Sequence, residues 1–143
     1  METVWDVLLT KTDTEVKKIR VKVQELRGRR DRAAAQKRKL TDLITEYHGR
    51  LSEIQTRSHN LSEASSYRQF IVQMQDLLVR AEAELKVADE ALSQIRQELI
   101  KSEGEKLKFE SLVEREKTNI RQQQKTKETR NTDENATLQY NWK

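Results

Sequence analysis

Cysteine and proline are absent from this chain of 143 residues, and only three glycines occur. The lack of cysteine excludes disulfides and thiolate chemistry and fits a reducing cytoplasm. Without proline, and with so few glycines, little in the sequence would break a helix. Hydrophobic residues make up 34% and aromatic residues 5%, whereas charged residues reach 36%. This composition is typical of a long coiled coil and leaves too little apolar mass for a globular core around a catalytic cavity.

Long hydrophobic runs are also missing. No window of about 18 apolar residues could span a bilayer, and the run VWDVLL near the N-terminus is too short for a signal peptide. We therefore expect a soluble, cytoplasmic protein without direct membrane insertion.

The residues that carry catalytic or metal chemistry are few and scattered. His48 and His59 have no neighbouring metal-ligand pattern, and the glycines form no phosphate-binding loop. The carboxylates between Glu82 and Glu90 would lie on an open helix surface, with no evident means of desolvation. We expect no enzyme activity, no catalytic residue, no metal and no cofactor.

Hydrophobic residues recur with a seven-residue repeat along residues 1–61. Thirteen of the eighteen a and d positions are apolar, where the composition alone would place about six. This excess predicts a coiled-coil helix, interrupted at the a positions Arg30 and Lys37. The apolar members are Trp5, Leu9, Val16, Ile19, Val23, Leu26, Ala33, Leu40, Ile44, Tyr47, Leu51, Ile54 and Leu61.

A second register of the same kind begins at Tyr67 and predicts a second coiled-coil helix over residues 67–130. Thirteen of its seventeen a and d positions are apolar, with a weak point around Ser102, Gly104 and Lys106. The apolar members are Tyr67, Ile71, Met74, Leu78, Ala81, Leu85, Ala88, Leu92, Ile95, Leu99, Phe109, Val113 and Ile120.

Small polar residues separate the two registers. Asn60 suits a left-handed position after the first helix, and Ser66 with Gln69 resembles a capping box that opens the second. We therefore place a turn at residues 62–66.

A short turn makes the two helices antiparallel neighbours. The predicted fold is all-α, with two long helices forming an antiparallel coiled-coil hairpin. Past the second helix, residues 131–143 are polar, and we expect a frayed tail there, with Leu138, Tyr140 and Trp142 as the residues able to dock.

Charge is distributed unevenly along the chain, although the net charge is only +4. Eleven lysines and arginines lie between Lys17 and Lys39, and acids dominate between Glu82 and Glu116. In an antiparallel pair, g positions face each other, which would bring Lys22 and Arg29 near Glu98 and Glu105. The densest basic run, Arg27 to Lys39, lacks interleaved aromatic residues, so a solvated face or an acidic protein partner is favoured over nucleic acid or a membrane surface.

Apolar residues also occupy g positions, which a two-stranded seam does not cover: Leu8, Leu43, Phe70, Leu77 and Leu112. One interpretation is that these residues widen the packed core of the coiled coil. A partner-binding surface is the favoured interpretation for a set of g-position residues and their seam neighbours. The set comprises Leu40, Leu43, Tyr47, Phe70, Met74 and Leu77.

The segment Tyr67-Arg68-Gln69-Phe70-Ile71, followed by Met74, Leu77 and Leu78, resembles the start of the second helix in the flagellar type III export protein FliJ family. The likeness extends to the length, the two helices, the position of the turn and an acidic pair at Asp133 and Glu134. It implies a stalk-like coiled coil similar to part of the ATP synthase gamma subunit. Such a protein is the central stalk of the flagellar export apparatus.

The resemblance also implies partners and binding residues. The expected partners are the hexameric flagellar export ATPase, the cytoplasmic domain of the export gate and export chaperones, whose recycling the protein would assist. The free protein would be a monomer, and the apparatus would hold it at the cytoplasmic face of the inner membrane. The gate-binding residues would be Gln36, Leu40, Leu43, Tyr47, Phe70, Met74, Leu77 and Ala81. The ATPase-ring residues would be Trp5, Leu8, Leu9, Phe109, Leu112 and Val113, with the bases Arg115, Lys117 and Arg121.

Two other readings remain open from the sequence. The chain also resembles the equivalent YscO-type stalk of virulence secretion systems. More distantly, the same heptads would suit a parallel homodimeric scaffold with no role in secretion.

Overall fold

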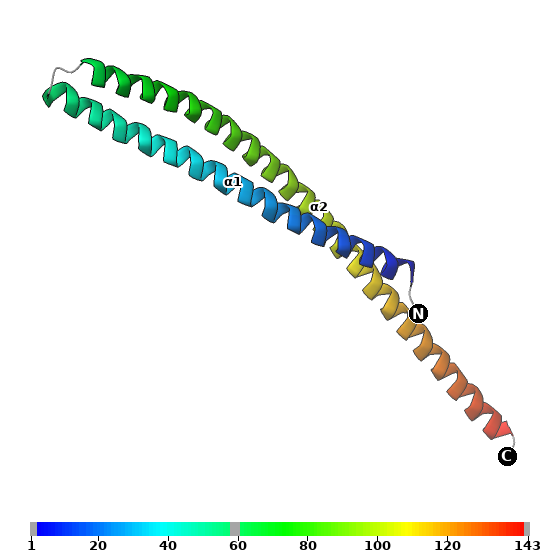
Figure 1. The fold of residues 1–143 in the computed structure, drawn as a ribbon. Helices are drawn as coiled ribbons and strands as arrows, with labels where there is room; N and C mark the ends of the chain where they lie inside the picture. The colour runs from blue at the N-terminus through cyan, green and yellow to red at the C-terminus, as the bar shows by residue number, and fades with distance from the viewer. Residues whose placement is uncertain (1–2, 58–60, 142–143) are drawn as a thin grey trace. The chain divides into compact units, whose positions relative to one another are not determined.

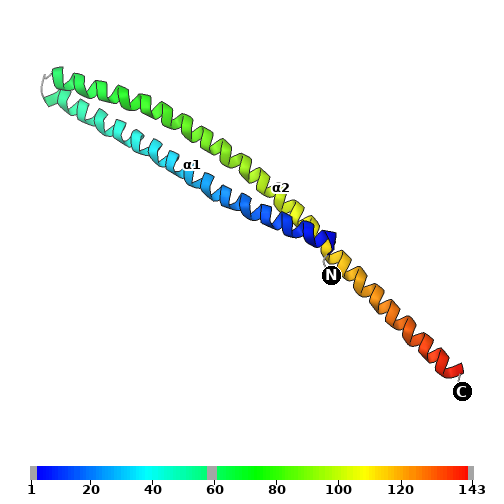
Figure 2. The same ribbon diagram turned by 45° about the vertical axis from the view of Figure 1, so that its right-hand side comes forward.

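Two α-helices make up the computed structural model, which describes residues 3–57 and 61–141. Helix α1 spans Val4–Arg57 and helix α2 spans Leu61–Asn141. The chain divides into two compact units, one formed by Met1–Lys17 with Ile100–Lys143 and the other by Lys18–Leu99. In the second unit, α1 and α2 lie side by side in opposite directions in both views (Figures 1 and 2). The predicted all-α antiparallel hairpin is confirmed.

The heptad pattern correctly predicts most of the buried apolar residues, but three predicted seam residues are exposed: Trp5 at 36%, Leu61 at 79% and Ile120 at 42%. In the unit Lys18–Leu99, Val23, Leu92 and Ile95 form a buried cluster, and Ile19, Leu26 and Leu99 pack against it. All six are predicted a or d residues. The other buried apolar residues at predicted a and d positions are Val16, Leu40, Ile71, Met74, Ala81, Ala88 and Val113. Because the seven-residue repeat keeps these positions on one side of a helix, the two apolar stripes meet as a seam.

Two of the polar residues at a and d positions, Thr12 and Arg30, are accommodated by specific bonds, whereas Glu116 Oε2 is buried without a hydrogen-bond partner among the described residues. Thr12 is buried, and its hydroxyl donates a hydrogen bond to the Leu8 carbonyl at 2.8 Å. The Nε atom of Arg30 lies 2.9 Å from Asp89 Oδ1 on the other helix. A long cationic side chain can follow the apolar seam while its charged end reaches a carboxylate at the edge.

The predicted pairing of g positions is corrected by the structure. Arg29 contacts Glu84, with 2.8 Å between Nη2 and Oε1, instead of the expected Glu98 or Glu105. Both residues are g positions, so the facing edge was identified correctly and the offset along the helix axes was not. Periodicity determines which side of a helix faces its partner, but it does not determine the axial offset.

The boundaries of the turn also differ from the prediction. Residues 62–66 are the beginning of α2. Ala64 is buried with 5% exposure, so the seam extends one heptad before Ile71. The Ser66 hydroxyl donates to the Ser62 carbonyl at 3.2 Å, a bond that satisfies a serine inside a helix. The expected roles of Ser58, His59 and Asn60 lie outside the described residues.

The expected tail is helical as far as Asn141, in contrast to the prediction of fraying from residue 131. This stretch contains no proline or glycine, and threonines along it bond back to the preceding turn, as Thr132 does to the Glu128 carbonyl at 2.9 Å. Every side chain from Lys117 to Tyr140 is exposed. The proposed docking of Trp142 lies outside the described residues.

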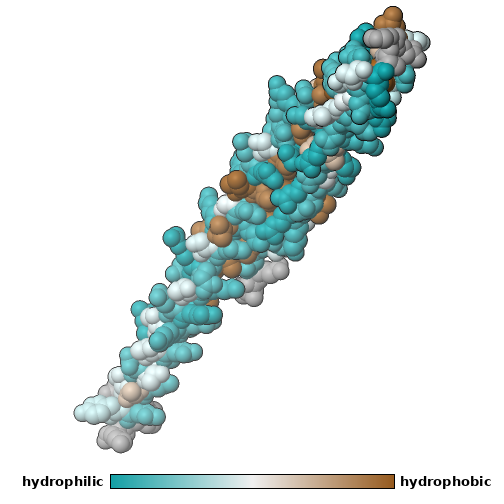
Figure 3. Space-filling model, turned by 90° about the vertical axis from the view of Figure 1, so that its left-hand side faces the viewer, coloured by the Kyte–Doolittle hydropathy of each residue, from teal (hydrophilic) through white to brown (hydrophobic). Residues whose placement is uncertain are grey.

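The described surface is predominantly polar, as Figure 3 shows for one face, where hydrophobic areas are interrupted by hydrophilic ones. Neither α1 nor α2, over the residues described, contains a stretch apolar and long enough to cross a membrane.

Truncation of the seam should lower stability. Leu92→Ala removes a side chain that is 4% exposed, and loss of this packing should reduce the free energy of unfolding by about 2 kcal/mol or more. Chemical denaturation followed by circular dichroism would measure the change. Leu107→Ala is the matched control, because Leu107 is 65% exposed, and its effect should stay below about 0.5 kcal/mol. Equal losses in the two variants would contradict the assigned seam.

Candidate functional site

The predicted gate-binding residues all belong to the unit Lys18–Leu99. The structure divides them by exposure. Leu40, Met74 and Ala81 are buried, and Leu43 and Tyr47 are partly buried. The exposed members are Gln36, Phe70 and Leu77, of which Phe70 is 43% and Leu77 48% exposed.

Aromatic residues form one cluster on this edge. The ring centroids of Tyr47 and Phe70 are 4.8 Å apart in an edge-to-face arrangement, and those of Tyr47 and Tyr67 are 5.7 Å apart. The Arg50 guanidinium lies 5.1 Å from the centre of the Tyr47 ring. Since α1 contributes Tyr47 and α2 contributes Phe70 and Tyr67, the cluster joins the two helices. The exposed part of Phe70 is thereby held in a defined position.

A shallow groove of about 500 Å³ is bordered by both helices. Four of its lining residues belong to the predicted gate-binding set: Gln36, Leu40, Leu77 and Ala81. The remaining lining residues are Arg29, Arg32, Ala33, Arg80 and Glu84. The structure therefore brings four members of the predicted set together in a groove and places Tyr47 and Phe70 in the aromatic cluster.

The arginines of the groove were not predicted as site residues. Arg29 and Arg32 lie in the basic run Arg27 to Lys39, which was read only as a whole, and Arg80 carried no distinguishing signal. Only the alignment of the two helices reveals that bases from both of them border the same groove as Leu77.

The predicted ATPase-ring residues belong to the other unit. Trp5 and Phe109 approach with 6.3 Å between their ring centroids. Val113 is buried, whereas Leu8, Leu9, Phe109 and Leu112 are partly buried. The three bases Arg115, Lys117 and Arg121 are exposed. This unit thus combines partly buried apolar side chains with exposed cationic groups on α2.

The start of α1 has a reciprocal cap that sequence reasoning missed. The Thr3 backbone N–H and hydroxyl both donate to Asp6 Oδ2 at 3.0 Å, and the Asp6 N–H donates to the Thr3 hydroxyl at 3.3 Å. The Thr3 backbone bond, followed by the hydroxyl bond, holds the pKa of Asp6 below its ordinary value. The signal was a threonine three residues before an acid, a capping-box spacing.

An ion pair links the helices in the same unit. Lys106 Nζ lies 2.9 Å from Asp13 Oδ1, and Lys17 Nζ lies 3.1 Å from Asp13 Oδ2. Hydrogen bonds from Lys106 and then Lys17 hold the pKa of Asp13 below its ordinary value of 3.8. Lys106, which interrupts the seam, is therefore balanced by a carboxylate of α1.

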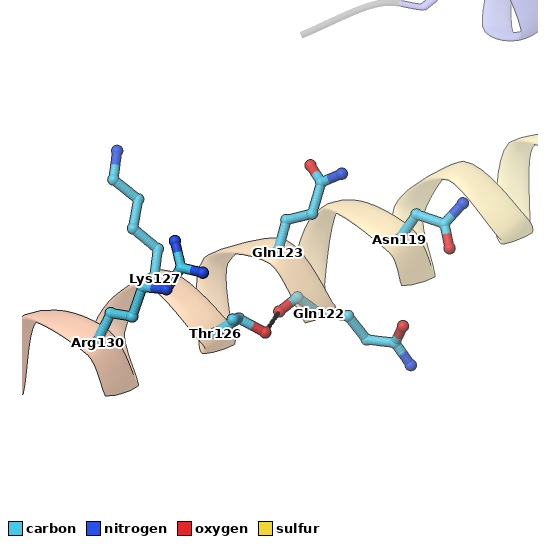
Figure 4. A pocket seen from close by; sticks show the side chains of 6 residues that line it. All are labelled: Asn119, Gln122, Gln123, Thr126, Lys127 and Arg130. Carbon is cyan, nitrogen blue, oxygen red and sulfur yellow. Dashed lines mark hydrogen bonds between the residues drawn. The ribbon is translucent and has the colours of Figure 1, made fainter. Parts of the chain in front are cut away.

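A second depression, of about 600 Å³, follows α2 beyond its pairing with α1 and offers no built site. It is lined by Asn119, Gln122, Gln123, Thr126, Lys127 and Arg130, all on one helix (Figure 4). The bond drawn there is the Thr126 hydroxyl donating to the Gln122 carbonyl at 2.9 Å. With walls from one helix only, the depression cannot enclose a ligand.

Within the described residues, no three His, Asp or Glu side chains are grouped as metal ligands. His48 is exposed, and His59 lies outside the described part of the chain. The described surface presents exposed apolar side chains, such as Phe70 and Leu77, and arginines that border the groove.

Comparison with known proteins gives one finding. The family model described as flagellar FliJ protein matches residues 6–143. No curated protein matches the chain, and no solved structure does.

The Asp13 ion pair predicts a pH-dependent stability. Because the folded-state pKa of Asp13 is lowered, its contribution is fully present above the unfolded-state pKa and is lost as the pH falls through the lower folded-state value. Asp13→Asn should therefore lower the melting temperature at neutral pH, and the difference from wild type should shrink below the ordinary pKa of 3.8. Circular dichroism melts over a pH series would measure it.

Asp76→Asn is the matched control, because Asp76 is exposed and none of the described ion pairs includes it. A constant difference between Asp13→Asn and wild type at every pH would contradict a role for the Asp13 carboxylate.

Proposed function

This chain belongs to the flagellar FliJ protein family, and from that membership we propose that it is the central stalk that links the export ATPase ring to the export gate. Membership itself associates the chain with flagellar protein export. In the proposed role the protein catalyses no reaction. It assists the recycling of export chaperones and is held at the cytoplasmic face of the inner membrane by its partners.

The exposure of Phe70 and Leu77 is the observation that carries the gate contact. Both are large apolar residues on one edge of α2, and they are 43% and 48% exposed. Their neighbours Leu40 and Met74 are buried in the seam, at 9% and 3%. Apolar side chains that remain in water above a packed base favour burial against a partner. We assign the gate contact to this edge, centred on Phe70 and Leu77, with Gln36, Leu43, Tyr47 and Ala81 around them.

The ATPase contact is proposed for the unit that contains both chain ends. Its packed residues Trp5, Leu8, Leu9, Phe109, Leu112 and Val113 would support the exposed bases Arg115, Lys117 and Arg121. Cations on a narrow helical support suit a pore lined with acids, because complementary charge guides association.

The coupling in this proposal is thermodynamic. If the nucleotide states of the ATPase ring bind the stalk differently, they bias how the stalk contacts the gate, by at most the difference in binding free energy. The packed seam between α1 and α2 would transmit the effect of ATPase binding along the stalk to the gate contact.

The gate contact predicts a separation of binding from stability. Phe70→Ala with Leu77→Ala should weaken binding to the purified export-gate cytoplasmic domain by about tenfold or more, as expected for central apolar contacts. Loss of the Phe70 contact with Tyr47 should cost only about 1 kcal/mol of stability. Isothermal titration calorimetry with thermal melts would measure both quantities.

Val72→Ala with Val79→Ala is the matched control. These valines are 55% and 65% exposed and lie two residues further along α2, on a different face. Equal weakening by both pairs would contradict the assigned edge. Light scattering on the free protein would detect a homodimeric scaffold, which the proposal does not allow.

The ATPase contact predicts an electrostatic dependence. Reversing Arg115, Lys117 and Arg121 to Glu should weaken binding to the export ATPase by about tenfold or more, and the wild-type affinity should fall with added salt. Surface plasmon resonance over a salt series would measure the change.

Reversal of Lys125, Lys127 and Arg130 provides an equal change in charge further along α2, where all three are also exposed. If the two triple reversals weakened ATPase binding equally, net charge and not the proposed site would be responsible.

A further inference from the structure

The groove between α1 and α2 has an apolar floor and a charged border. Ala33 and Leu40 of α1 and Leu77 and Ala81 of α2 provide apolar lining over a volume of about 500 Å³. Leu77 remains 48% exposed. A volume of this size is in the range of small binding sites, and its floor would accept one or two apolar side chains.

Two of the charged groups at the border neutralise each other. The Nε and Nη2 atoms of Arg29 donate to the same oxygen, Glu84 Oε1, at 3.1 Å and 2.8 Å. Arg29 and Glu84 come from opposite helices, so this pair closes part of the border and contributes no net charge.

The other two charged groups, Arg32 and Arg80, have no carboxylate partner in the part of the chain that the structure describes. Both are exposed, and among the described residues neither belongs to an ion pair. Arg32 comes from α1 and Arg80 from α2, and both line the groove. The terminal Nη1 of Arg32 lies over Gly28, 3.2 Å from the place that a Cβ would take. The groove therefore has an uncompensated charge of two on an apolar floor.

We propose that this groove binds an acidic amphipathic segment of a protein partner. An apolar side chain of the segment packs on Leu40, Leu77 and Ala81, and flanking carboxylates pair with Arg32 and Arg80. The planar guanidinium groups can each donate two parallel bonds to a carboxylate. The inference rests on the proposed function for the identity of the partner, the export-gate cytoplasmic domain.

An acidic protein segment fits better than a nucleic acid or a membrane surface. Nucleic acids and membrane surfaces need many phosphate contacts, whereas among the described residues only two bases without an ion pair border the groove. The apolar floor would also remain unfilled by a phosphate backbone. The combination of one apolar contact and two separated cations instead matches a helix with an apolar residue between acids.

Paired variants of equal charge test the arginines. Arg32→Ala with Arg80→Ala should weaken binding to the gate domain by about tenfold or more, since both carboxylate pairs are lost. Arg38→Ala with Lys39→Ala removes the same charge from two exposed bases of the same run outside the groove, and should change binding by less than about threefold. Arg32→Lys with Arg80→Lys should restore part of the affinity. Thermal melts of all three should match wild type.

A second probe separates this inference from the proposed function. An 18-residue helical peptide, with leucines on one face flanked by glutamates, is titrated into isotope-labelled full-length protein, alongside a twin peptide with glutamines. The acidic peptide should shift the NMR signals of Arg32, Arg80 and Leu77, leave Arg38 unchanged, and lose its effect with salt.

The outcomes are distinguishable. If the gate domain fails to bind wild type while the acidic peptide shifts the groove signals, the assigned gate contact fails and the inference holds. Equal shifts with both peptides, or equal loss of gate binding in both alanine pairs, would overturn the inference. So would binding of duplex DNA or anionic phosphatidylglycerol vesicles that depends equally on Arg32, Arg80, Arg38 and Lys39.

Discussion

Burial of apolar side chains between α1 and α2 is the interaction on which the rest of this structure depends. In the unit Lys18–Leu99, the cluster of Val23, Leu92 and Ile95 represents this seam. Two helices alone can cover only the stripe that faces the partner, so all other residues stay in contact with water. Both proposals accordingly concern the surface, namely the exposed apolar residues at the edge of the seam and the arginines beside them.

Charge determines how the helices align and what the edges can bind. Arg30 would be costly in an apolar seam, but its pairing with Asp89 at 2.9 Å keeps its charged end at the edge. Arg29 is balanced by Glu84 in the same unit, and Lys106 by Asp13 in the other. Exposed pairs of this kind contribute little free energy each, but a wrong alignment would leave the partners unmatched. Arg32 and Arg80 stand apart, because their charges remain available to a ligand.

The proposed gate edge shows how one seam can support a binding surface. Met74 and Leu40 are buried beneath it, while Phe70 is held by its edge-to-face contact with Tyr47. A side chain that is already positioned loses less conformational entropy when a partner covers it. In the proposed site, the buried members would therefore act as its support, and the exposed members would supply the contact area. Met74 and Leu77 belong to the same predicted set, but a mutation of Met74 is expected to lower stability, whereas a mutation of Leu77 is expected to weaken partner binding.

Periodicity in the sequence predicted the helical fold and most of the buried positions, because a seven-residue repeat assigns each residue to a face of its helix. The short connection between the two registers predicted their antiparallel pairing. Periodicity also identified Phe70 and Leu77 as apolar residues outside the seam. The start of α2 could not be settled in this way, since serine hydroxyls either cap a helix or, as at Ser66, bond back within one. Only the tertiary structure decided the axial offset between the helices. That offset pairs Arg29 with Glu84 and places Arg32 and Arg80 at the same groove, because a repeating pattern is satisfied by several alignments and only packing and charge select one.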